Sequence, residues 1–166
     1  MKYVLDSHTH TIASGHAYST LHEMAKAASD KGLELLGITE HSMRMPGTCH
    51  EYYFQNMRIL PREMYGIEVM HGAEVNIMDL NGSLDMKQEL LEKMDVVVAS
   101  MHTPCLKAGS RQENTHAFIE AMKNPWVNIA GHPDDSRYPL DYLALVQAAK
   151  EFHVLLELNN NSLHPL

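Results

Sequence analysis

Three histidines lie within nine positions near the start of the chain, at His8, His10 and His16. Residues i and i+2 of a strand point to the same side, so His8 and His10 can bind one metal ion together. His16, in the loop that follows, can reach the same neighbourhood. Imidazole nitrogens bind zinc, manganese and iron, and the spacing therefore predicts a metal site.

Further imidazole and carboxylate side chains stand at or near the ends of short apolar runs. They are Glu40 and His41 in LELLGITEH, Glu74 in EVMHGAEVNI, His102 in VVVASMH and His132 in VNIAGHP. One histidine at a strand end is usually just hydrogen-bonded or exposed, but recurrence at five strand ends favours one shared site. Glu74 is the acid best placed to bridge two ions, whereas Glu40 could orient a ligand instead of binding an ion.

The elements that would position these residues alternate along the chain. Six runs are typical of strands, at residues 3–8, 33–41, 68–77, 96–102, 127–133 and 154–160. Helices are predicted between them at 19–32, 83–94, 113–124 and 139–152, with Pro61 interrupting a less regular segment at 50–66. This alternation predicts an α/β fold with a parallel sheet. In a parallel barrel the carboxyl ends of the strands form one face, so the histidines should converge there.

Three residues mark the ends of predicted helices. Thr20 and Glu23 can form a capping box before the first helix, and Gly32 can end it. Pro139 could occupy the first turn of the last helix, where its missing N–H costs nothing.

The composition is that of one soluble domain spanning residues 1–166. Apolar residues make up 45% and charged residues 20% of the chain, and the net charge is −8. That charge argues against a nucleic-acid or membrane surface. No apolar run has membrane-spanning length, and Cys49 and Cys105 are too few for a disulfide framework. A cytoplasmic location is expected.

The motifs together resemble the PHP (polymerase and histidinol phosphatase) superfamily of metal-dependent phosphoesterases. HTHTIASGHAYST is similar to its first motif, GITEHS to its second and HGAEVNI to its third, while SMH and GHP match its later single-histidine positions. The segment YYFQNMRILPR is similar to a loop of the small stand-alone phosphatases of the superfamily. The resemblance implies a distorted (β/α)7 barrel with up to three metal ions at its C-terminal face, usually zinc, with manganese or iron as alternatives.

The resemblance also implies a division of the ligands among three ions. His8 and His10 would bind the first ion, and Glu74 would bridge it to a second ion completed by His102 and His132. His16 and His41 would hold the third. The second motif more often reads Asp-His, so Glu40 is a departure and is assigned an orienting role.

A larger departure concerns the end of the barrel. The superfamily completes its site with an Asp-x-His pair on the last strand, and no such pair follows GHP in these 166 residues. Six strand runs are present where seven are expected, so the domain is predicted to lack its last strand and flanking helices. Truncation and natural loss both remain open. Either would expose a sheet edge, and we expect poor solubility, self-association or binding of a complementary C-terminal fragment.

The expected chemistry is hydrolysis of a small phosphorylated metabolite. A metal-bound water held by His8, His10 and Glu74 would have its pKa lowered, to roughly 7 in well-studied zinc sites, and so supply hydroxide. Four basic residues are candidates to hold the substrate phosphate: Arg58, Arg111, Arg137 and Lys107. A metal-dependent nuclease and a non-catalytic metal-binding remnant are the alternatives, and the acidic charge disfavours the nuclease. The sequence does not identify the substrate.

Overall fold

The structure is a computed structural model that describes residues 3–159, and it contains one largely parallel sheet. The sheet order is β1 (Leu5–Thr9), β2 (Leu35–His41), β4 (Ile67–Asn76), β5 (Val96–Ser100), β6 (Ile129–Ala130) and β7 (Leu155–Leu156). These six strands correspond to the six predicted runs, and the α/β class is confirmed. The two-residue strand β3 (Glu63–Met64), antiparallel to β4, was not predicted.

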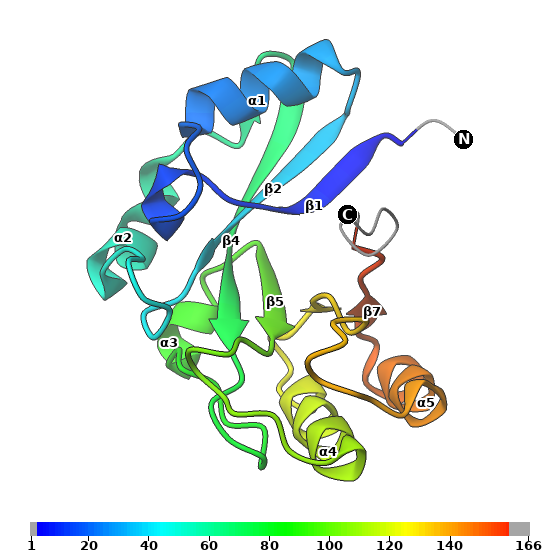
Figure 1. The fold of residues 1–166 in the computed structure, drawn as a ribbon. Coiled ribbons are helices and arrows are strands. Elements are labelled where there is room, and N and C mark those ends of the chain that lie inside the picture. Colours follow the sequence, from blue (N-terminus) through cyan, green and yellow to red (C-terminus); the bar gives the residue numbers. More distant parts are fainter. Residues whose placement is uncertain (1–2, 160–166) are drawn as a thin grey trace.

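The sheet curls into a half-barrel, with β1 and β7 at its two ends (Figure 1). Within residues 3–159 no strand pairing joins β1 to β7, so this part of the barrel is open. Two glycines allow neighbouring strands to approach closely. A Cβ atom on Gly37 would lie 2.5 Å from the Ser7 carbonyl oxygen, and one on Gly72 would lie 2.0 Å from that of Val96. Any larger residue at these positions would push the strands apart.

Helices connect the strands. They are α1 (Leu21–Asp30), α2 (Glu51–Asn56), α3 (Gln88–Leu91), α4 (Arg111–Met122) and α5 (Tyr142–Phe152), with short 3-10 turns at η1 (Ile12–Ser14) and η2 (Met57–Ile59). The capping box of Thr20 and Glu23 at the start of α1 is confirmed. Gly32 follows this helix with a φ of 75°, a conformation that favours glycine.

The prediction for the start of the last helix was wrong. Pro139 lies before α5, and Asp141 caps the helix by accepting hydrogen bonds from the amides of Leu143 and Ala144. A short polar side chain supplies the acceptor that the first turn needs, which proline cannot do. Helix α4 also begins two residues before its predicted segment, because Ser110 and Glu113 form a second capping box.

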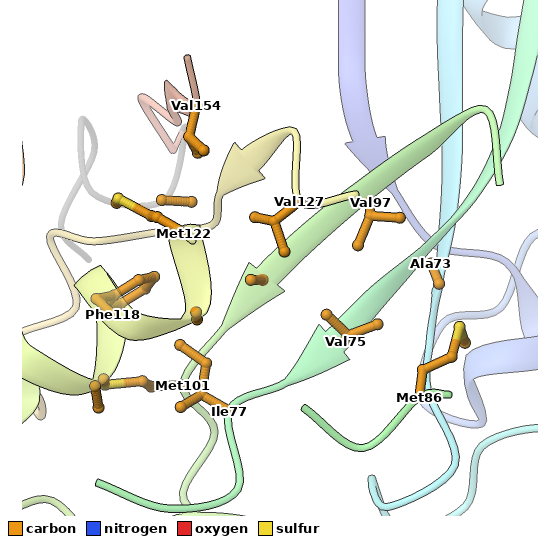
Figure 2. Packing of buried hydrophobic residues seen from close by; sticks show 14 of the residues in the cluster. Ala73, Val75, Ile77, Met86, Val97, Met101, Phe118, Met122, Val127 and Val154 are labelled. Atoms are coloured by element: carbon orange, nitrogen blue, oxygen red, sulfur yellow. The ribbon is translucent and has the colours of Figure 1, made fainter. Parts of the chain in front are cut away.

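The two faces of the sheet carry different residues, because side chains alternate along each strand. The outer face holds the main core, in which Val75 and Val97 pack with Phe118 and Met122 of α4. Figure 2 shows these side chains together with Met101, Val127 and Val154. The inner face holds a small separate cluster formed by Val96, Val98 and Ile129 with Met70 against it. Helix α1 covers the outer face of β2. None of the helices in residues 3–159 is long and apolar enough to cross a membrane.

Candidate metal centre

Glu74 lies near the carboxyl end of β4, and its side chain is only 1% exposed. Five histidines surround its carboxylate. The nitrogen–oxygen distances are 3.2 Å for His8, 3.3 Å for His10, 2.7 Å for His41, 3.3 Å for His102 and 3.0 Å for His132. The structure thus brings five of the six predicted histidine ligands directly to the predicted bridging acid.

Strand register explains why these side chains meet. His41 is paired directly with Glu74 across β2 and β4, and paired residues of neighbouring strands point to the same face. Glu40 is paired with Ala73 and therefore points to the opposite face. The alternation of side chains along β2 therefore places His41 beside Glu74 and its neighbour Glu40 on the other face of the sheet.

The donor atoms form two groups that could hold a metal ion. His8, His10 and Glu74 make up the first, and His41, Glu74 and His102 the second, with the donor atoms of each group within 4.8 Å of one another. Nδ1 of His41, Nε2 of His8 and Oε2 of Glu74 are buried without a well-formed hydrogen bond. Imidazole and carboxylate donors left in this state fit zinc, manganese or iron.

This grouping differs from the division that the resemblance implies. His102 lies with His41 in the second group, whereas the resemblance paired His102 with His132. His132 contacts Glu74 but belongs to neither group. His16 does lie beside His41, with 3.1 Å between their Nε2 atoms. Two ring nitrogens at that distance need a proton or an ion between them, so the pair is compatible with a third position.

Glu40 lies on the opposite face of β2 from His41 and is hydrogen-bonded to residues beside the site. Its buried carboxylate accepts hydrogen bonds from the Thr11 amide and hydroxyl and, at 2.5 Å, from the Ser14 hydroxyl. The Ser14 hydroxyl lies 3.0 Å from His10 Nδ1 and also accepts the His41 N–H. Through Ser14 the Glu40 carboxylate is linked to both His10 and His41, which is compatible with the orienting role assigned to it.

Three further residues that the sequence analysis missed fix histidine rings. Asn76 Oδ1 lies 2.8 Å from His102 Nδ1, and Glu157 Oε1 lies 3.0 Å from His8 Nδ1. Ser14 Oγ lies 3.0 Å from His10 Nδ1. A signal for Glu157 was present, since it follows the apolar residues 154–156 of the run VLLELNN and so lies near the end of a predicted strand, as the other site residues do. Ser14 and Asn76 carry no distinguishing pattern in the sequence.

Burial and charge shift the pKa values of the cluster in opposite directions. Burial would raise the pKa of Glu74, but hydrogen bonds from its histidines hold it well below its usual range. Burial would lower the pKa of His8, but the adjacent carboxylates of Glu157 and Glu74 raise it to about 10. For His41 burial dominates, and its pKa is lowered despite Glu74. Binding a cation at His8 therefore requires that a proton leave it.

A cavity of about 1480 Å³ opens over the cluster and continues between β1 and β7. Arg137 lines it and pairs with Asp135 at 2.6 Å. The other three predicted phosphate-binding residues are not among the residues that line it: Arg58, Arg111 and Lys107. Arg111 instead lies at the start of α4 and donates a hydrogen bond to the Leu140 carbonyl. The structure brings only Arg137 of the four to the candidate site.

Comparison with known proteins agrees with this architecture. The chain is 50% identical over 162 residues to a protein of Clostridium novyi named probable phosphatase, covering 98% of this chain and 66% of the relative. Proteins of the same name from Thermoanaerobacter pseudethanolicus and Acetivibrio thermocellus are 49% and 48% identical, with 98% of this chain and 66% and 67% of the relatives covered. The chain thus spans about two thirds of the length of these relatives. Residues 6–161 match the model of the PHP domain, and the chain belongs to the PHP domain family.

Proposed function

We propose that this chain carries the metal centre of a phosphoesterase that hydrolyses a small phosphorylated metabolite. The observation that supports this most directly is the buried carboxylate of Glu74 with five histidine nitrogens within 3.3 Å of it. The name probable phosphatase, carried by relatives about half identical to the chain, points the same way. A centre of this kind without ions would leave several buried polar atoms unsatisfied.

The proposed ligands follow the two groups described above. His8 and His10 would hold one ion and His41 and His102 another, with Glu74 shared by both. His16 and His132 would extend the set towards three ions, for which zinc is the first choice and manganese or iron are alternatives. Bound there, divalent ions would lower the pKa of a coordinated water and neutralise negative charge on a phosphate ester.

The rest of the chain would admit, orient and retain the substrate. The cavity over the cluster is open to solvent at residues such as Ser136 and Arg137, so a small phosphate ester can reach Glu74 and its histidines. Arg137 presents the guanidinium best placed to contact a phosphate, and Asp135 limits its movement through their ion pair. We propose that the reaction takes place in the cytoplasm.

Activity on p-nitrophenyl phosphate, measured beside activity on single-stranded DNA, tests this function. The protein would be prepared with zinc and separately with manganese, and Glu68→Gln would serve as a matched variant, because Glu68 lies exposed on the same strand as Glu74. We expect hydrolysis of the aryl phosphate by the wild type and Glu68→Gln and none by Glu74→Gln. Cleavage of DNA alone would favour a nuclease, and tight metal binding with neither activity would favour a non-catalytic protein.

A further inference from the structure

Glu157 occupies an unusual position beside the candidate metal centre. It directly follows β7, and its backbone N–H donates to the Ala130 carbonyl 3.0 Å away. Its side chain is 13% exposed and turns towards the cluster. Oε1 lies 3.0 Å from His8 Nδ1, and Oε2 accepts the backbone N–H of His132 at 2.5 Å. Each carboxylate oxygen therefore has a partner from a different candidate ligand.

The His8 ring is held between two carboxylates. Nδ1 faces Glu157, and Nε2 faces Glu74 at 3.2 Å. In metal sites, the partner of the second ring nitrogen fixes which nitrogen carries the proton and which is free for the ion. The Glu157 carboxylate accepts a hydrogen bond, so Nδ1 must carry the proton. Nε2, on the side of Glu74 and His10, is then the nitrogen whose lone pair can bind the ion.

The second contact of Glu157 acts on the backbone of His132. This residue has a φ of 29°, in the left-handed region that non-glycine residues seldom adopt. Such a conformation persists only where neighbouring groups hold it, and the bond from the His132 N–H to Glu157 is one of these. With it, the His132 ring reaches Glu74 at 3.0 Å.

Glu157 also connects parts of the sheet that do not pair with each other. In residues 3–159, β1 pairs with β2, and β7 pairs with β6, at opposite ends of the strand order (Figure 1). The contact between His8 and Glu157 crosses from one end to the other beside the candidate ions.

We propose that Glu157 is a positioning residue, which aims His8 Nε2 at the ion shared with His10 and Glu74 and holds His132 against Glu74. It acts through these two histidines and is not itself a ligand. The inference rests on the proposed metal centre, and nothing in it depends on which phosphate ester is hydrolysed. Asn159 also contacts Glu157 Oε1, at 3.3 Å, and would help to hold the carboxylate in place.

Glu157→Gln is the most informative variant, because it keeps the size of the side chain. The amide offers one acceptor oxygen, while two donors, the His8 ring and the His132 N–H, require one each. Glu157→Ala removes both acceptors. Glu151→Gln is the matched control, since Glu151 is an exposed residue of the same charge on α5. The free energy of unfolding of each metal-free variant shows whether the fold is retained.

Zinc affinity, measured by competition with a chromophoric chelator, provides the test. We expect Glu157→Gln to weaken binding roughly 10- to 100-fold, the usual effect of removing a partner of a metal-bound histidine, and Glu151→Gln to have no effect. In a His8→Ala background, the same Glu157 substitution should have a much smaller effect, because its main target is absent. A purely structural role would reduce affinity by the same factor in both backgrounds.

Crystals of the metal-free Glu157→Ala protein, which has neither acceptor oxygen, give a second readout, in which the His8 ring should leave its position beside Glu74. Unchanged zinc affinity, an equal loss in both backgrounds or an unmoved His8 ring would each overturn the inference. Phosphatase activity is measured on the same preparations. Zinc binding that depends on Glu157 in a protein without phosphatase activity would refute the proposed function and leave this inference standing.

Discussion

His41 Nδ1 lies 2.7 Å from Glu74 Oε2, and the two residues are direct register partners on the neighbouring parallel strands β2 and β4. This contact places a histidine from one strand against the acid shared by both candidate ion groups. The same carboxylate also contacts histidines from β1 and from the segments that follow β5 and β6.

Replacing both His8 and His10 with alanine should remove at least one metal equivalent. The two rings supply all the nitrogen donors of the first group, so Glu74 alone would remain there. Elemental analysis by mass spectrometry measures the metal per protein. The matched control replaces the exposed His22 and His116 with alanine, which should change nothing. An equal metal count in the two double variants would contradict the assignment of this group.

Ser14→Ala should destabilise the metal-free protein by about 1–3 kcal/mol, the cost of leaving buried polar partners unsatisfied. The hydroxyl is fully buried, donates to Glu40 and accepts the His41 N–H. Urea unfolding gives the free energy, and the exposed Ser136→Ala is the control. If Ser14→Ala unfolds like the control, the Glu40 network does not hold the site together.

The metal-free protein should lose stability both above and below neutral pH. The pKa of His8 rises from 6.5 to about 10 on folding, so its contribution is complete below 6.5 and is lost as the pH approaches 10. Burial would raise the pKa of Glu157, but its bond to His8 lowers it from 4.5, so its contribution is present above 4.5 and is lost in acid. Melting temperatures measured in chelator from well below pH 4.5 up to about pH 10 test this. His8→Gln should flatten the alkaline fall, and an unchanged slope would count against the His8 contacts.

Arg137→Ala should raise KM for p-nitrophenyl phosphate about tenfold, as expected for the loss of a hydrogen bond to a charged group. Arg137 lines the cavity over the cluster, whereas Arg58, the matched control, is exposed and does not line it. We expect Arg58→Ala to keep the KM of the wild type. Equal KM values for the two variants would remove Arg137 from the substrate site.

The strands and the convergence of the histidines could be predicted from the sequence, because both follow from local periodicity. Apolar runs fix the strands, and the carboxyl ends of parallel strands must lie at one edge. The spacing of His8 and His10 then places both beside Glu74. The division of the histidines into groups could not be predicted, because it depends on strand register and on distances in the folded chain. The register pairs His41 with Glu74, and the donor atoms of His41, Glu74 and His102 lie within 4.8 Å of one another.

The supporting residues were harder to predict for a related reason. Ser14 and Asn76 are ordinary polar residues whose roles depend on distances of about 3 Å between segments far apart in sequence. The positions of the basic residues could not be predicted either. Arg58, Arg111 and Lys107 were candidates because cationic side chains bind phosphate, and that chemistry does not indicate whether a residue will line the cavity over the cluster.

The metal content of Glu74→Gln tests the central claim most directly. A glutamine of the same shape is a neutral and poorer ligand, and Glu74 belongs to both donor groups. Wild type, Glu74→Gln and the exposed control Glu68→Gln would be loaded with zinc, dialysed together and analysed for metal equivalents. We expect the control to match the wild type and Glu74→Gln to lose at least two equivalents together. Full retention of zinc by Glu74→Gln would contradict a metal centre built around this carboxylate.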